Sequence, residues 1–354
     1  MRSSMVAGLL CLNFTVPMGA DILEVPSQYP SIQAAIEAAT DGDEVVVSSG
    51  SYQEAIDFLG KRILVRSLDG PQATSIQPPP GLNRPAVTFA AKESVNSILR
   101  GFKLGGNAGA IIDDPVFGPT PVGGAIFCFE ASPRIEQCDL IGSIIEGHGA
   151  GMVIVRAAPS VTECQFIGNT SAGHGGAIYI LDNANPVISG CLFSDNAASW
   201  GGAITCMLSS HATISDCVFQ ENISTNVGGA VYIRSSSDPV LELCTFLDNT
   251  QSGNPFAGGA AVTVYGSGNG GGPCHPTLKS CIFDANRSEA YGGGVFAAYS
   301  GNPILTECVF TRNSSGLGGG GISAVGNLQT PTVVVIDGCQ IEGNQAITAG
   351  GGVD

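Results

Sequence analysis

Two histidines, His148 and His174, stand 26 residues apart, and each lies inside a Gly-His-Gly triplet. Imidazole nitrogens bind metal ions and transfer protons near neutral pH, so a pair held on neighbouring strands would place two such groups together. No third ligand stands in register with them. The spacing therefore favours a stacked surface stripe that continues with Trp200, and the faces of such rings would also suit contact with sugars.

Asp113 and Asp114 form the only adjacent carboxylate pair within an inserted segment. Paired carboxylates can hold calcium or divide acid and base roles, but an ordinary solvated loop is the favoured interpretation of this pair. We assign no catalytic, cofactor-binding or metal-binding residue from the sequence. Asp113, Asp114, His148 and His174 remain the candidates to follow, and calcium is the only cofactor considered.

The elements that must position these residues come from an internal repeat. A glycine pair opens each copy from residue 123 to the end, and a weaker copy begins near Gly149. The pairs are Gly123-Gly124, Gly175-Gly176, Gly201-Gly202, Gly228-Gly229, Gly258-Gly259, Gly293-Gly294, Gly319-Gly320 and Gly351-Gly352.

Within each copy a cysteine stands at the same point, most often 26 or 27 residues after the previous one. An aliphatic residue lies three positions before it, a large apolar residue two after it, and asparagine five after it in all copies but the first. The cysteines are Cys138, Cys164, Cys191, Cys217, Cys244, Cys281, Cys308 and Cys339, and the asparagines are Asn169, Asn196, Asn222, Asn249, Asn286, Asn313 and Asn344.

This spacing predicts a coil of three short strands. The cysteine and the apolar residue two positions later face the same side of a strand, whereas the aliphatic residue three positions earlier does not, so a bend must separate them. A second bend follows at the asparagine. With no helical periodicity between copies, about ten or eleven such coils stack into a parallel β-helix in which each column packs on itself.

The stacked columns predict two interior features. Asparagine amides at an inward bend should hydrogen-bond from coil to coil. The column cysteines should be buried free thiols, because parallel side chains lack the converging geometry that a disulfide needs. Disulfides remain the alternative for an exported chain, and the state of Cys274 stays open.

Composition limits the partners. The chain has 354 residues with a net charge of −16, which disfavours nucleic acid and anionic membrane surfaces. Residues 1–20 have the pattern of a signal peptide, and no later run is long enough for a membrane-spanning helix. We expect a single β-helix domain at 21–354, with a cap and irregular first coils at 21–122 and regular repeats at 123–354. The chain stops four residues into a new coil, so we also expect a truncated C-terminus.

The first coils have a helical cap. Tyr29–Ala39 begins with proline and spaces aliphatic residues four apart, which predicts a short amphipathic helix over the open end of the stack. Short β runs follow at Glu44–Val47, Arg62–Ser67 and Ala86–Ala90.

Two segments carry a family resemblance. Ser31–Glu54 resembles the opening of pectin-lyase-like right-handed β-helix proteins, including pectin methylesterases. The repeats resemble those of the polymorphic outer membrane proteins, whose GGAI and FxxN signatures match Gly175–Ile178 and Phe193–Asn196. The resemblance implies an all-β, right-handed parallel β-helix, and this fold hosts both enzymes and adhesins.

An enzyme of this fold needs carboxylates on neighbouring coils beside a basic residue, and the repeat spacing reveals no such column. We therefore expect a non-catalytic exported protein, secreted or associated with the outer membrane, of adhesin-like or glycan-contacting type. The alternative is a lyase or hydrolase of acidic polysaccharides. A polysaccharide or cell-surface partner fits both.

Overall fold

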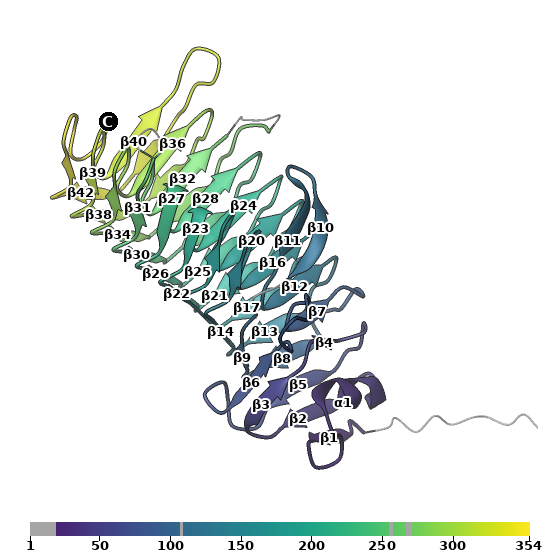
Figure 1. The fold of residues 1–354 in the computed structure, drawn as a ribbon. Helices are drawn as coiled ribbons and strands as arrows, with labels where there is room; N and C mark the ends of the chain where they lie inside the picture. The colour runs from purple at the N-terminus through teal and green to yellow at the C-terminus, as the bar shows by residue number, and fades with distance from the viewer. Residues whose placement is uncertain (1–18, 107–108, 255–257, 267–270) are drawn as a thin grey trace, which may run out of the picture.

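The computed structural model describes residues 19–106, 109–254, 258–266 and 271–354. These residues form one rod of stacked parallel coils that runs from the N-terminal end to the C-terminal end (Figure 1). The predicted signal peptide at 1–20 lies outside the described residues except for Gly19 and Ala20. In the described ranges, no helix has the length and apolar character needed to cross a membrane.

Three long parallel sheets, here named A, B and C, run along the rod. Sheet A has 12 strands: β1 (Ile22–Val25), β2 (Glu44–Val47), β5 (Leu64–Ser67), β8 (Ile98–Arg100), β13 (Arg134–Glu136), β17 (Ser160–Thr162), β21 (Val187–Ser189), β25 (Thr213–Ser215), β29 (Val240–Glu242), β33 (Thr277–Lys279), β37 (Ile304–Thr306) and β41 (Val335–Asp337).

Sheet B has 11 strands: β3 (Gly50–Gln53), β6 (Thr74–Gln77), β9 (Lys103–Leu104), β14 (Asp139–Ile141), β18 (Gln165–Ile167), β22 (Leu192–Ser194), β26 (Val218–Gln220), β30 (Thr245–Leu247), β34 (Ile282–Asp284), β38 (Val309–Thr311) and β42 (Gln340–Glu342). Sheet C has 10 strands: β4 (Ile56–Asp57), β7 (Val87–Phe89), β12 (Ile126–Phe129), β16 (Met152–Val155), β20 (Ile178–Leu181), β24 (Ile204–Met207), β28 (Val231–Arg234), β32 (Val262–Tyr265), β36 (Val295–Ala298) and β40 (Ile322–Val325).

The regular coils carry a fourth short strand that the three-strand prediction did not include. It forms an 8-stranded sheet, here sheet D: β15 (Ile144–Ile145), β19 (Thr170–Ser171), β23 (Ala197–Trp200), β27 (Ile223–Val227), β31 (Thr250–Gln251), β35 (Arg287–Ser288), β39 (Ser314–Ser315) and β43 (Gln345–Ala346). Most of these strands span only two residues, too few to show a strand periodicity in the sequence. One coil therefore passes through sheets C, A, B and D in turn.

The predicted columns lie in register. Ile135 pairs with Val161 in sheet A, and Leu140 pairs with Phe166 in sheet B. From Phe166 to Phe310 the phenylalanine rings stack with centroids 4.5 to 4.9 Å apart, close to the spacing between neighbouring strands. Each apolar side chain therefore packs on its own copy in the next coil.

The two predicted bends are single residues in the left-handed region. The residue before each column cysteine has φ between 51° and 62°, and the residue before each column asparagine has φ between 52° and 65°. Leu243 and Asp248 are examples, each at a position where a residue with a Cβ is strained. Because each bend uses one residue, the strands of sheets A, B and D follow one another closely.

The asparagine ladder is confirmed. Each side chain from Asn169 to Asn313 is fully buried. The Asn249 amide donates to the carbonyl of Phe219 at 2.8 Å and to Oδ1 of Asn286 at 2.9 Å, while its Oδ1 accepts from Asn222. A continuous polar ladder thus runs inside the apolar core, with its hydrogen bonds satisfied.

The cysteines that the structure describes are all free, and the column members from Cys138 to Cys308 are buried. Burial raises the pKa of Cys206 and Cys274 to about 12, so these thiols stay protonated. This agrees with the prediction of thiols that pack as small apolar groups.

Helix α1 (Ile32–Ala38) covers the N-terminal end of the stack, as the sequence predicts (Figure 1). Ser31 caps it, accepting from the backbone N–H of Ala34 at 3.1 Å. Ile32 and Ile36 are fully buried. Along the chain the helix follows β1 and precedes β2, so one strand of sheet A comes before the cap in the sequence.

Candidate functional site

The outward side chains of β16, β20 and β24 in the middle of sheet C are buried, unlike those of the other long sheets. All four residues of β20 are buried, although alternate residues of a strand point to opposite faces. In β21 and β22, only the inward residue is buried. Other parts of the chain must therefore cover sheet C from outside.

An antiparallel hairpin provides part of this cover. Strands β10 (Ala110–Asp114) and β11 (Gly118–Val122) pair with each other and lie beside sheet C on the right-hand side of Figure 1. Val122, Ala110 and Ile112 pack against the outward side chains of β16 and β20, including Val153 and Tyr179. The insertion that the sequence left unstructured is thus a folded lid over these strands.

Asp114 holds the hairpin in place. Its Oδ1 accepts from the backbone N–H groups of Val116 and Phe117 at 2.8 and 3.1 Å, which closes the turn. Its Oδ2 accepts from the hydroxyl of Tyr179 at 3.0 Å, so one carboxylate joins the turn to sheet C. Asp114 and Tyr179 are both buried, and burial together with this carboxylate raises the pKa of Tyr179 well above its ordinary value.

The two candidate histidines lie beneath the hairpin turn. The ring of Phe117 lies 5.0 Å from that of His148 and 5.1 Å from that of His174, centroid to centroid. The backbone N–H of His174 donates to Nδ1 of His148 at 2.9 Å. Beyond His174, Trp200 stacks at 4.7 Å with an interplanar angle of 17°. The predicted order of side chains is confirmed.

The stripe is not a surface stripe, however. His148 is 7% exposed and His174 is 2% exposed, because Phe117 and the hairpin cover them. Burial lowers the pKa of His148, with an opposing effect from Asp114, and burial lowers the pKa of His174 well below its ordinary value. Nε2 of His148 and Nδ1 of His174 are buried without a hydrogen-bond partner. The site therefore holds two neutral imidazoles, each with a buried ring nitrogen that has no hydrogen-bond partner.

A metal ion does not fit this arrangement. One nitrogen of His148 already accepts a backbone hydrogen bond, and Asp114 is engaged by Tyr179. Over the described ranges, no group of three or more histidine, cysteine, aspartate or glutamate side chains is placed to hold a metal ion. The two imidazoles and the rings beside them can take part in proton transfer and ring contact.

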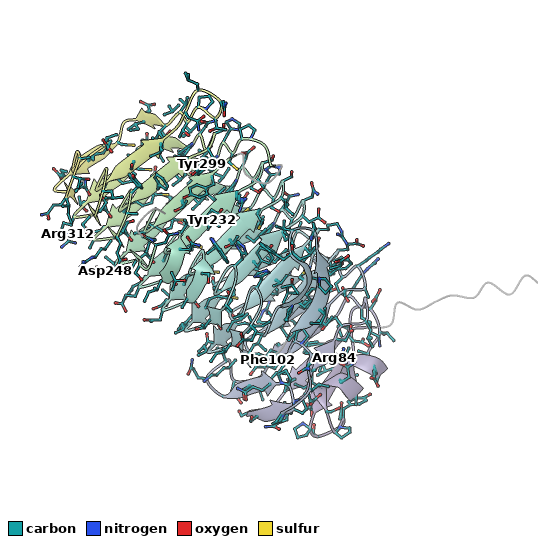
Figure 2. The ribbon with its side chains drawn as sticks, turned by 45° about the horizontal axis from the view of Figure 1, so that its top comes forward. Arg84, Phe102, Tyr232, Asp248, Tyr299 and Arg312 are labelled. Carbon is teal, nitrogen blue, oxygen red and sulfur yellow. The ribbon has the colours of Figure 1, made fainter. Side chains whose placement is uncertain are left out.

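Ring contacts continue along sheet C beyond the histidines. We name as the aromatic row Phe117, His148, His174, Trp200, Tyr232, Tyr265 and Phe296. Tyr232 lies 6.2 Å from His174, Tyr265 lies 5.7 Å from Tyr232, and Phe296 lies 5.9 Å from Tyr265. In Figure 2, Tyr232 and Tyr299 lie over strands that face the viewer. Phe117, at one end of the aromatic row, is 46% exposed. Near the other end, Tyr299 is 51% exposed; its ring lies beside that of Tyr265, but it is not part of the row.

The structure thus brings together three of the four sequence candidates, Asp114, His148 and His174. Asp113 lies apart from them. It lines a separate cavity of about 370 Å³ beside the hairpin, together with Phe127, Phe129 and Arg156. The Arg156 guanidinium lies 4.7 Å above the ring of Phe129. Asp113 and Asp114 therefore face different parts of the structure, because consecutive residues of a strand point to opposite sides.

Sequence reasoning missed Tyr179 and the tyrosines of the aromatic row. A signal was present, because Tyr179 follows Ile178 in the Gly-Gly-Ala-Ile-Tyr segment, and strand parity directs it outward when Ile178 points inward. The cover was not visible from the repeat. The hairpin lies in an insertion that has no counterpart in the other coils.

Comparisons with known proteins agree with this architecture. A family model described as right handed beta helix region matches residues 120–269 and 158–346. The crystal structure of an alginate lyase from Paenibacillus sp. str. FPU-7 superposes with a TM-score of 0.53 at 12% identity, covering 90% of this chain and 99% of that one. The catalytic unit of a thermostable GH87 alpha-1,3-glucanase from Streptomyces thermodiastaticus superposes with a TM-score of 0.50 at 14% identity, covering 94% and 70%. At these identities the likeness shows the fold alone. No curated protein matches the chain at a significant level.

Proposed function

This chain belongs to the right-handed β-helix family, and on that premise we propose that it is an exported, non-catalytic protein that binds polysaccharide along the outer face of sheet C. The observation that carries the proposal is the aromatic row. Its rings lie on successive coils with centroids 4.7 to 6.2 Å apart. Phe117, Trp200 and Tyr265 are at least partly exposed, and the other members of the row are buried. Exposed rings spaced along several coils can each pack against the apolar face of a sugar unit.

Other features support the proposal. The two solved structures of similar fold are named as enzymes that act on alginate and on alpha-1,3-glucan, so polysaccharides are handled by folds of this shape. The repeats resemble those of polymorphic outer membrane proteins, which supports an adhesin-like role outside the cell. The net charge of −16 favours neutral polymers along most of the rod.

The test is whether the protein binds polysaccharides: affinity electrophoresis measures binding to soluble polymers, and pull-down measures binding to insoluble ones. We expect retention by at least one neutral glucan and roughly a tenfold weaker interaction for Trp200→Ala, since stacking contributes on the order of 1 kcal/mol per ring. Leu68→Ala is the matched control, because Leu68 is exposed and lies away from sheet C. Equal retention of Trp200→Ala and the parent protein would remove the basis for the proposal.

A second candidate is a polysaccharide lyase or hydrolase, favoured by the unpaired imidazole nitrogens beside Tyr179. A buried tyrosine hydrogen-bonded to a carboxylate, with two neutral imidazoles nearby, can relay a proton once the hairpin opens. Incubation with polygalacturonate, alginate and neutral glucans, with and without calcium, should then release reducing ends or unsaturated products. Turnover that Tyr179→Phe abolishes would replace binding by catalysis as the function of this face.

A further inference from the structure

A second polar site lies on sheet B, which runs along a different side of the rod from sheet C (Figure 1). Lys103 on β9 and Asp139 on β14 are direct Cα partners on neighbouring coils. They point outward, because Leu104 and Leu140 beside them are buried in the core. The repeat spacing did not reveal this pair, since the hairpin insertion separates the two residues by 36 positions instead of 26.

Asp139 is unusual for an outward carboxylate. It is only 3% exposed, and Nε2 of Gln72 donates to its Oδ2 at 2.7 Å from the turn before β6. Burial raises the pKa of Asp139, while Lys103 and the Gln72 amide oppose that shift. Gln165 on β18 follows Asp139 in the column and is neutral. As the pH falls, the Asp139 carboxylate therefore takes up a proton, and the negative charge beside Lys103 is lost.

A cavity of about 510 Å³ opens on the same face. Its walls include Gln77 on β6, Ile141 two residues after Asp139, and the loop at 78–83. Gly106 closes another wall, where a Cβ would lie 2.0 Å from the carbonyl oxygen of Gly124, so only glycine fits. Gln53 adds a second amide from the preceding coil, in register with Gln77.

These groups define the chemistry of a ligand. The volume falls within the range of small-molecule sites, and two amides offer both donors and acceptors to hydroxyl groups. Lys103 does not line the cavity itself, but it stands two residues before Gly105, which does, and strand parity turns both residues to the outward side of sheet B. The two positions are about 7 Å apart along the strand, a distance comparable to the length of a lysine side chain. Lys103 has no ion pair within 4.0 Å among the described carboxylates. We propose that Lys103, Gln53, Gln77 and this cavity bind a single sugar unit that carries one anionic group, either a carboxylate or a sulfate.

The site is independent of the aromatic row, so each proposal can fail alone. The row offers rings to a polymer on sheet C, whereas the sheet B cavity offers amides and one cation to a single unit. The polymer test with Trp200→Ala therefore does not bear on the cavity. Conversely, a change at Lys103 should leave retention by a neutral glucan unchanged.

The experiment is calorimetric titration of the protein with glucuronate, glucose 6-sulfate and glucose. We expect at least one anionic probe to bind roughly tenfold more tightly than glucose, which lacks a partner for Lys103. Binding of glucuronate alone would identify a carboxylated unit, and binding of glucose 6-sulfate alone a sulfated one. Equal binding of all three probes, or no saturable binding, would overturn the proposal.

Three variants sharpen the test. Lys103→Met should weaken the anionic probe by roughly tenfold, and Gln77→Glu should weaken it while sparing glucose. Asp139→Asn should act in the opposite direction, tightening the anionic probe at pH 7 and removing the gain in affinity that the parent protein shows as the pH falls. Lys279→Met is the matched control, since Lys279 pairs with Glu242 on sheet A. A Lys103→Met protein that binds the anionic probe like the parent would contradict the site.

Discussion

The interior columns and the outer face of sheet C are built on opposite principles. Inside, the phenylalanines from Phe166 to Phe310 and the asparagines from Asn169 to Asn313 stack on copies of themselves in neighbouring coils, so one residue type satisfies the contacts along each column. Outside, the strands β16, β20 and β24 present different side chains at equivalent positions, Val153, Tyr179 and Thr205. Uniform stacking stabilises the rod, and departure from uniformity creates the sites.

The largest expected effect lies in the phenylalanine column. Phe219 is fully buried between Phe193 and Phe246, with ring centroids 4.7 Å away on each side. Phe219→Ala should lower the free energy of unfolding by about 3–5 kcal/mol, because both neighbours lose a ring contact and a cavity remains. Chemical denaturation measures this. A loss no larger than that of an exposed change such as Leu68→Ala would contradict the stacked interior.

Breaking the polar ladder should have the next largest effect. Asn249→Leu leaves the backbone carbonyl of Phe219 and the amide of Asn222 without their partner. We expect a loss of about 1–3 kcal/mol, the usual cost of an unsatisfied buried polar group. Thermal and urea unfolding test it, and Asn254→Leu, outside the ladder, is the comparison. Equal melting of Asn249→Leu and the parent would count against an inward ladder.

The outer face of sheet C should show a pH dependence that the interior lacks. His148 and His174 have lowered pKa values in the folded protein, whereas the unfolded chain titrates near the ordinary value of 6.5. The unfolded state then binds more protons below pH 6.5, so stability is fully present above that pH and is lost as the pH falls below it. The loss approaches about 1.4 kcal/mol per pH unit for His174, whose pKa is lowered furthest, and is smaller for His148, where Asp114 opposes the effect of burial.

The control for this pH effect is a pair of variants. His174→Gln should flatten the dependence of unfolding on pH between 6.5 and 5, whereas His211→Gln should not, since His211 is exposed. Phe117→Ala should have an intermediate effect, because it uncovers both imidazoles and lets their pKa values move toward 6.5. Histidine titrations followed by NMR would measure this directly.

The smallest expected effect lies at the bends that separate the sheets. Leu243 is exposed and has φ of 55°, a conformation that costs a residue with a Cβ more than glycine. Leu243→Gly should stabilise the protein by roughly 0.5 kcal/mol, the strain relieved less the extra entropy of the unfolded chain. Val240→Gly, in the adjoining strand, should instead destabilise it. Opposite signs for the two changes are the outcome to look for in thermal unfolding.

The glycine pairs do not mark the same structural position in every copy of the repeat. Val262 and Val295 occupy the same strand position as Val231, yet they stand four and two residues after the first glycine of the pairs at 258 and 293. The shared feature is instead a glycine with positive φ three residues before each valine, Gly228, Gly259 and Gly292. Where several glycines follow one another, the sequence alone does not indicate which of them adopts positive φ.

The amino-acid sequence by itself determined the columns, the ladder, the buried thiols and the capping helix, because in a stack each interior residue meets its own copy and the repeat therefore states the contacts. It also carried the order from His148 through His174 to Trp200. Tertiary structure alone decided that a hairpin covers the histidines, that Asp114 reaches Tyr179 across 65 residues, and that Lys103 stands beside Asp139. Those contacts join an insertion to the stack or cross it, and an insertion has no copy in the next coil from which its neighbours could be inferred.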